Sequence, residues 1–159
     1  MEIYRAYYMS KIGMLEILGN EDGISAINFV NGKLQPTKAS EIHPSLIDCI
    51  DQLQRYFEGS LKEFNVKLNI AGTEFQKKVW NELMKIPYGK TVSYLYIAKS
   101  IGNEKAVRAV GGANNKNKIP IIIPCHRVIG NNGKLIGYAG GLGIKEWLLK
   151  HEGALKHNY

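Results

Sequence analysis

The chain changes character between Lys67 and Thr73, and this change most constrains the fold that its 159 residues can adopt. Before it, short strand-like segments alternate with turn formers; after it, the helical spacing of apolar residues predominates. Residues 1–69 hold 7 Lys/Arg and 9 Asp/Glu, a net charge of −2, whereas residues 70–159 hold 14 Lys/Arg and 5 Asp/Glu, a net charge of +9. We predict two domains, 1–69 and 70–159. The positive charge of the second domain is typical of a domain that binds a polyanion. A lysine-rich surface that is simply solvated would give the same net charge.

The first domain is predicted to be a small β-sheet followed by a helix. Its strand-like segments, separated by turn-forming residues, span residues 4–8, 13–18 and 24–30. One face of the helix is marked by apolar residues at helical spacing, namely Leu46, Ile50, Leu53 and Phe57. Pro44 suits the first turn of this helix and Gly59 its C-terminal cap. Cys49 lies beside the apolar stripe, so we expect it to be a small core residue rather than a reactive one.

The second domain begins with three predicted helices. Thr73 and Gln76 form a capping box for the first of them, and Ser93 can cap the second, which stops at Gly102. The third spans residues 104–114. Two short helices joined by a tight glycine-containing turn form the helix-turn-helix pattern, in which the third helix would be the recognition helix. Such a pair also occurs as plain helix packing in proteins that bind no DNA, but the basic charge of this domain favours DNA binding.

The segment Pro124–Val128, with the sequence PCHRV, follows an apolar run from Ile119 to Ile123 that we predict to be a strand. Thiol reactivity is thiolate reactivity, and flanking His and Arg residues place Cys125 where a thiolate could be favoured. Because Pro124 interrupts the hydrogen bonding of a strand, we expect the strand to end there and to deliver Cys125 to the edge of a pocket. The pattern alone leaves a hydrolase, a thiol transferase and a buried structural cysteine open.

These residues resemble the O6-alkylguanine-DNA alkyltransferases, which transfer an alkyl group from damaged DNA to their own cysteine. The resemblance covers essentially all of residues 70–159 and rests on Lys105–Ala113, Pro124–Val128, Tyr138–Leu142, Lys145–Leu149 and His151–Gly153. Residues 1–69 fit the variable N-terminal domain of the family in outline. The fold implied is α+β: a small N-terminal α/β domain, with a β-sheet plus helix of the RNase H-like kind, followed by a mostly helical C-terminal domain with a helix-turn-helix.

The resemblance also implies a catalytic set. Cys125 would be the nucleophile and permanent alkyl acceptor, and His126 would act as its base through a water molecule. Glu152 would hold the imidazole and complete a Cys-His-Glu relay. Asn117 would tie the recognition helix to the cysteine segment, and Tyr94 would donate a hydrogen bond or proton to the guanine as it leaves.

The DNA contacts are implied in the same way. Arg108 would enter the duplex and fill the gap left by an extruded nucleotide. Tyr94 would lie near the guanine ring, and Asn103 and Asn131 would contact the DNA backbone.

The expected substrate pocket is lined by Tyr138, Ala139, Gly140 and Val128. Ala139 stands where a serine of some members can contact the guanine oxygen. Asn114 replaces an apolar residue of the recognition helix, so a hydrophobic contact with the flipped base is expected to be lost. The small Gly140 predicts tolerance of bulky O6 substituents such as benzyl.

The implied activity is that of a single-turnover methylated-DNA-[protein]-cysteine S-methyltransferase, because no residue of the motif regenerates the thiol. Its partner would be double-stranded DNA containing O6-alkylguanine, with O4-alkylthymine as a further substrate. We expect no cofactor and, since no Cys/His cluster has zinc-ligand spacing, no metal. Two cysteines, no long apolar stretch and no signal peptide predict a protein of the cytoplasm, nucleoid-associated in a prokaryote, or of the nucleus. No segment is built for a dimer interface, so we expect a monomer.

Three other classes of protein remain as alternatives. A damage-recognition protein without chemistry would lack the acceptor cysteine. A helix-turn-helix regulator would bind a specific operator sequence. A cysteine hydrolase would turn over repeatedly on an ester or amide.

Overall fold

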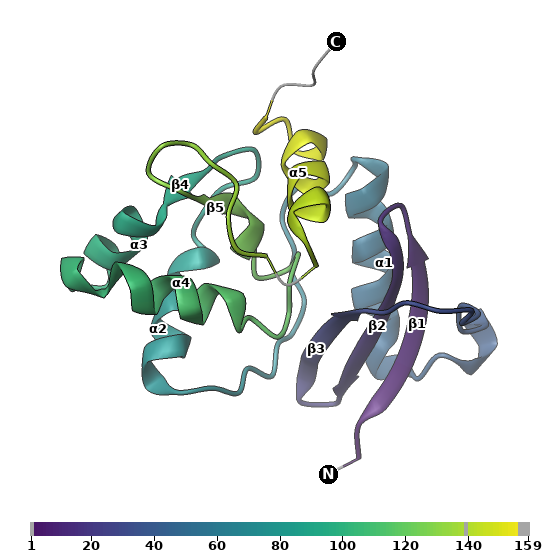
Figure 1. Cartoon of the computed structure of the whole chain (residues 1–159). Coiled ribbons are helices and arrows are strands. Elements are labelled where there is room, and N and C mark those ends of the chain that lie inside the picture. Colours follow the sequence, from purple (N-terminus) through teal and green to yellow (C-terminus); the bar gives the residue numbers. More distant parts are fainter. Residues whose placement is uncertain (1, 139, 156–159) are drawn as a thin grey trace. The chain divides into compact units, whose positions relative to one another are not determined.

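The computed structural model describes residues 2–138 and 140–155, so the prediction made for Ala139 falls outside the described residues. The chain divides into two compact units, Met1–Ala71 and Gly72–Tyr159 (Figure 1). The division lies two residues after the predicted boundary. In the part of the chain described, no helix is long and apolar enough to cross a membrane.

Unit 1 is an antiparallel sheet packed against one long helix. The strands β1 (Tyr4–Ser10), β2 (Gly13–Asn20) and β3 (Gly23–Phe29) pair in chain order and are joined by tight turns. The three predicted strands are therefore confirmed. A short 3₁₀ turn, η1 (Ala39–Glu41), precedes the helix.

The helix α1 (Pro44–Glu58) begins and ends where its sequence predicts. The backbone N–H of Ser45 donates to His43 Nδ1 at 3.1 Å, and the N–H of Gly59 satisfies carbonyls of the last turn. Gly59 can do so because its φ of 87° is accessible to glycine without a steric penalty. The buried face of α1, which packs on β1 and β2, consists of Leu46, Cys49, Gln52, Leu53, Tyr56 and Phe57.

Unit 2 is mostly helical. Its helices are α2 (Glu74–Leu83), α3 (Tyr94–Ser100), α4 (Val107–Asn115) and α5 (Leu142–His151), with the 3₁₀ turn η2 (Glu104–Ala106) before α4. The capping box of Thr73 and Gln76 and the Ser93 cap are both present. α4 packs against α2 and α3, and the indole Nε1 of Trp80 in α2 donates to the Ala113 carbonyl of α4 at 2.9 Å. Two short parallel strands, β4 (Val92–Ser93) and β5 (Val128–Ile129), pair beside these helices.

The predicted strand from Ile119 to Ile123 is wrong. This segment is a buried turn in which the N–H of Ile123 donates to the Ile119 carbonyl at 3.0 Å. Pro120 and Pro124 lack the N–H that a central strand needs, and Ile121 adopts a φ of 76°, which strands exclude. A β-branched residue in this left-handed region is strained by about 1–3 kcal/mol, and the complete burial of Ile121 offsets that cost.

Candidate active site

Cys125 opens the 3₁₀ turn η3 (Cys125–Arg127) directly after this buried turn, and 4% of its surface is exposed. Asn117 clamps the preceding segment, because its Nδ2 donates to the Ile123 carbonyl at 2.7 Å and its Oδ1 accepts from the Ile119 N–H at 3.0 Å. A second amide joins α4 to the cysteine itself: Asn114 Nδ2 donates to the Cys125 carbonyl at 3.3 Å. The thiol is thus held by the backbone of a rigid turn.

The thiol of Cys125 is protonated at neutral pH. Burial raises its pKa to about 11, although a hydrogen bond from Asn117 and the charge of Lys145 lower it. The flanking His and Arg residues therefore leave the resting thiol protonated, and their expected role in favouring a thiolate stays a prediction. The imidazole of His126 is uncharged, and the guanidinium of Arg127 forms an ion pair with Glu152.

His126 and Glu152 form a buried pair that can generate the thiolate. His126 Nε2 lies 2.7 Å from Glu152 Oε2. Burial lowers the pKa of His126 and outweighs the hydrogen bond and charge of Glu152, which raise it, so the ring is neutral. A carboxylate only accepts, so Nε2 carries the ring proton and Nδ1 keeps its lone pair. Nδ1 has no hydrogen-bond partner among the described residues and can accept a proton.

Arg127 completes this pair, whereas the sequence indicated it only as a cation beside Cys125. Its Nε donates to Glu152 Oε1 at 2.8 Å, its Nη2 to Oε2 at 3.1 Å, and its Nη1 to the Ile86 carbonyl at 2.7 Å. Burial raises the pKa of Glu152, but the hydrogen bonds and charges of His126 and Arg127 outweigh it and hold that pKa well below its usual range. Glu152, which pattern alone would place in solvent, is a buried anion.

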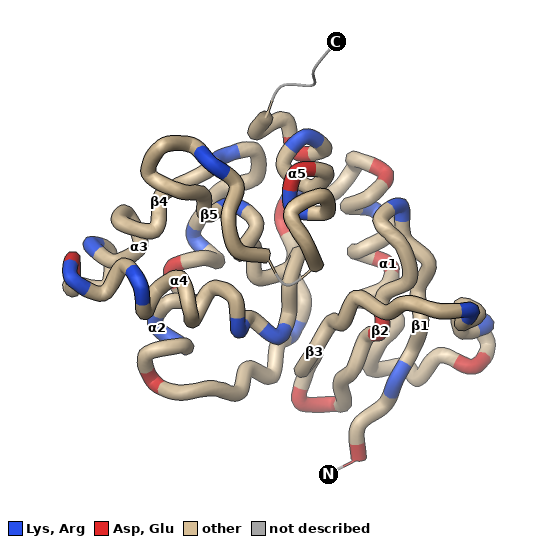
Figure 2. The backbone as a smooth tube through the Cα atoms, in the orientation of Figure 1, with Lys and Arg blue, Asp and Glu red and all other residues tan. Residues whose placement is uncertain are grey.

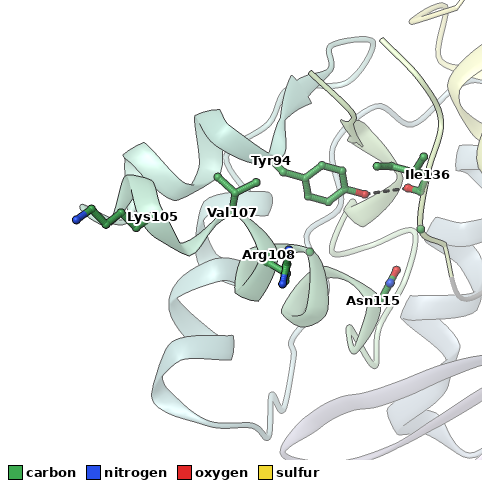
Figure 3. A pocket seen from close by; sticks show the side chains of 8 residues that line it. Tyr94, Lys105, Val107, Arg108, Asn115 and Ile136 are labelled. Atoms are coloured by element: carbon green, nitrogen blue, oxygen red, sulfur yellow. Dashed lines mark hydrogen bonds between the residues drawn. The ribbon is translucent and has the colours of Figure 1, made fainter. Parts of the chain in front are cut away.

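A second buried cation, Lys145, was also missed. Its ammonium donates to the carbonyls of Val128 and Ile136, and burial lowers its pKa to about 8. The hydroxyl of Tyr94 donates to the same Ile136 carbonyl at 2.8 Å (Figure 3). Burial raises the pKa of Tyr94 to about 12, so this hydroxyl is a hydrogen-bond donor at neutral pH.

Tyr94 forms one wall of a cavity of about 810 Å³ (Figure 3). Its other lining residues come from α4, the turn before α4 and the loop after β5: Lys105, Val107, Arg108, Gly111, Asn115, Ile136 and Gly137. Arg108 is exposed on α4, so the cavity combines an aromatic donor with a solvent-accessible cation. The predicted residues Tyr94 and Arg108 are brought together here.

The other predicted contact residues lie on several loops. Asn103 and Asn131 are exposed, in the turn before η2 and the turn after β5 respectively. Val128 is buried in β5, whereas Tyr138 and Gly140 are half-buried. None of these five lines the 810 Å³ cavity.

Basic residues are spread over unit 2. Figure 2 shows Lys and Arg along α2, α3 and α4 and in the turns between them. Among residues 2–138 and 140–155, no group of three or more His, Cys, Asp and Glu side chains is arranged to hold a metal ion.

Comparisons with known proteins cover both units. The family model described as the DNA binding domain of 6-O-methylguanine DNA methyltransferase matches residues 74–154, and the model of its ribonuclease-like domain matches residues 3–70. The methylated-DNA--protein-cysteine methyltransferase of Methanosarcina acetivorans is 54% identical over 155 residues, which are 96% of this chain and 99% of that protein. Its counterpart from Mycobacterium leprae is 44% identical over 90% of this chain and 88% of its own length.

Two solved structures have the same fold. The O6-methylguanine methyltransferase of Mycobacterium tuberculosis superposes with a TM-score of 0.85 at 42% identity and covers 96% of this chain and 94% of its own. The same organism's protein in complex with DNA gives a TM-score of 0.83 at 43% identity, over 93% of this chain and 92% of that one.

Proposed function

This chain belongs to the 6-O-methylguanine DNA methyltransferase family, and from that membership we propose that it transfers the alkyl group of O6-alkylguanine in double-stranded DNA irreversibly to Cys125. The observation that carries this assignment of roles is the buried pair of His126 and Glu152, which leaves one imidazole nitrogen beside the cysteine turn able to accept a proton. A relative solved in complex with DNA supports DNA as the partner.

The proposed reaction begins with removal of the thiol proton. His126 Nδ1 takes it from Cys125 through a water molecule, and Glu152 stabilises the imidazolium. The thiolate attacks the alkyl carbon in line with its bond to the guanine oxygen, so the S–C bond forms as the C–O bond breaks. The electron pair of the C–O bond stays with guanine, which takes up the proton and leaves as a neutral base. The stable thioether ends the reaction after one turnover.

The electrostatics suit a reaction of this kind. A neutral imidazole is able to act as a base, whereas a protonated one is not. The positive charge of Arg127 offsets the negative charge of Glu152. The buried groups around His126 therefore carry no net negative charge that would oppose formation of the Cys125 thiolate. Tyr94 keeps its proton and can donate a hydrogen bond to the leaving base.

DNA binding is assigned to the α3–α4 region, as a helix-turn-helix with α4 as the recognition helix. The alkylated base must leave the stack to reach the buried Cys125. Arg108, exposed beside the Tyr94 cavity, enters the duplex in its place. Asn103 and Asn131 contact the DNA backbone, and Val128, Tyr138 and Gly140 line the final base site. O4-alkylthymine is a further substrate, and the protein acts in the cell compartment that holds DNA.

The test is the intact mass of the protein after incubation with a duplex containing one O6-methylguanine. We expect a stoichiometric gain of one CH₂ group that is absent in Cys125→Ser and present in the matched control Cys49→Ser. Damage-selective binding without a gain in mass would instead indicate a recognition protein. Repeated cleavage of an ester or amide by the wild-type protein would indicate a hydrolase.

A further inference from the structure

Asn114 carries a buried acceptor that the chain itself does not use. Its side chain is 2% exposed, and its Oδ1 has no hydrogen-bond partner among the described residues. The orientation of the amide is fixed, because the Cys125 carbonyl only accepts and must therefore face Nδ2. Since a buried acceptor without a donor is destabilising, an apolar residue would be the more stable choice at this point of α4.

The unused acceptor lies beside the groups assigned to the reaction. The Asn114 side chain is a near neighbour of both groups: its Nδ2 donates to the carbonyl of Cys125, and its amide acts to lower the pKa of the Tyr94 hydroxyl. The side chain that carries the unused acceptor and the tyrosine that carries a donor are therefore neighbours, next to the nucleophile. The Tyr94 hydroxyl donates to the Ile136 carbonyl in this structure (Figure 3). An acceptor atom of a substrate can replace that carbonyl as the partner of the hydroxyl.

This pairing matches one edge of one kind of damaged base. O6-alkylguanine presents an acceptor, ring nitrogen N3, next to a donor, the 2-amino group. O4-alkylthymine presents the O2 acceptor but no donor, because alkylation removes the proton from its N3. We propose that Asn114 Oδ1 accepts a hydrogen bond from the 2-amino group of extruded O6-alkylguanine while Tyr94 donates to N3. This inference rests on the proposed alkyl transfer. Asn114 is then a specificity-determining residue that favours guanine over thymine.

The test compares two duplexes that differ by this amino group alone, one with O6-methylguanine and one with O6-methylhypoxanthine. Single-turnover rates of alkyl transfer are measured for the wild type and for Asn114→Leu, whose side chain has the same number and branching of heavy atoms as Asn. We expect the wild type to react about tenfold faster with O6-methylguanine, the value of one hydrogen bond, and the ratio to approach one in Asn114→Leu. The preference for O6-methylguanine over O4-methylthymine should shrink in parallel.

The ratio separates recognition from structure. Loss of the bond to the Cys125 carbonyl slows both reactions alike and cancels in the ratio. The inference would be overturned if the wild type and the variant gave the same ratio of O6-methylguanine to O6-methylhypoxanthine rates. It would also be overturned by a wild-type ratio near one, a result that requires no variant. Either result is expected if Oδ1 binds only a water molecule. Asn114→Ala, which also lacks an acceptor, serves if Asn114→Leu does not fold. Failure of the proposed function itself is distinct, because the wild type would then react with neither duplex.

Discussion

The two cysteines of this chain are both buried, yet they lie in very different surroundings. Cys49 lies on the apolar face of α1 and is 1% exposed; burial and the charge of Asp48 raise the pKa of its thiol to about 12. Cys125 is 4% exposed, and burial raises its pKa to about 11. The groups near Cys125, however, include Asn117 and Lys145, which lower that pKa.

The comparison shows that burial and pKa do not distinguish a nucleophile from a core residue. Both thiols are protonated at neutral pH. What distinguishes Cys125 is a clamped turn, together with a neutral imidazole beside it whose proton acceptor is unused. In the proposed reaction, the reactivity of Cys125 therefore depends on neighbours that can move a proton.

The largest effect on the contrast between the two cysteines is expected when the general base, His126, is removed. We expect His126→Gln to lower the rate of alkyl transfer by about 10²–10⁴-fold, the usual contribution of a general base, and so to make Cys125 nearly as inert as Cys49. Single-turnover kinetics with an O6-methylguanine duplex measure the effect, with circular dichroism as the check on folding. A rate within a few-fold of wild type would mean that the thiol finds its proton acceptor elsewhere.

A smaller effect on rate is expected from Arg127→Met. The change leaves Glu152 buried without its cation and should cost about 3–5 kcal/mol of stability, measured by urea unfolding. Since the charge of Arg127 lowers the pKa of His126, its loss raises that pKa. Below this pKa the base is protonated and inactive, so the acidic limb of the pH–rate profile moves to higher pH.

In the wild type the same reasoning places that acidic limb below pH 6.5, because the pKa of His126 is lowered from 6.5. The control is Arg127→Lys, which keeps the positive charge but loses the bidentate geometry. Its acidic limb should stay close to that of the wild type. An unshifted profile in Arg127→Met would show that Arg127 acts only on stability.

The smallest effect belongs to the other cysteine. Cys49→Ala should leave the rate of alkyl transfer unchanged and lower the free energy of unfolding by about 1 kcal/mol, because it removes one buried atom from the core of unit 1. Thermal unfolding and the mass assay measure the two quantities. A lower rate of alkyl transfer in Cys49→Ala would contradict the contrast between the two cysteines, since it would mean that Cys49 takes part in the reaction.

Features set by neighbouring residues were predictable from sequence. Pro44 and Gly59 mark the ends of α1, and Thr73 with Gln76 marks the start of α2, because caps and glycine conformations act within a few residues. The turn at Ile121 was not predictable. A run of apolar residues buried on all sides has no periodicity, so it looks the same whether it is a strand or a turn.

The site was predictable only where a family resemblance supplied long-range information. Glu152 lies 26 residues from His126, and no local pattern joins them. Arg127 reaches the Ile86 carbonyl across 41 residues, and Lys145 is fully buried although helical lysines are usually solvated. The partners of these two cations are backbone carbonyls and a carboxylate placed by the fold, and composition and spacing do not reveal such partners.

The burial of Cys125 also matters before any damage is met. A protein that reacts once has to keep its thiol intact while it waits, in the presence of peroxides and soluble electrophiles. With a pKa of about 11, roughly one thiol in 10⁴ is ionised at pH 7, and oxidants and electrophiles attack mainly the ionised form. A cysteine that is 4% exposed and mostly protonated therefore reacts slowly with such molecules, and its thiol stays available for its single reaction with alkylated DNA.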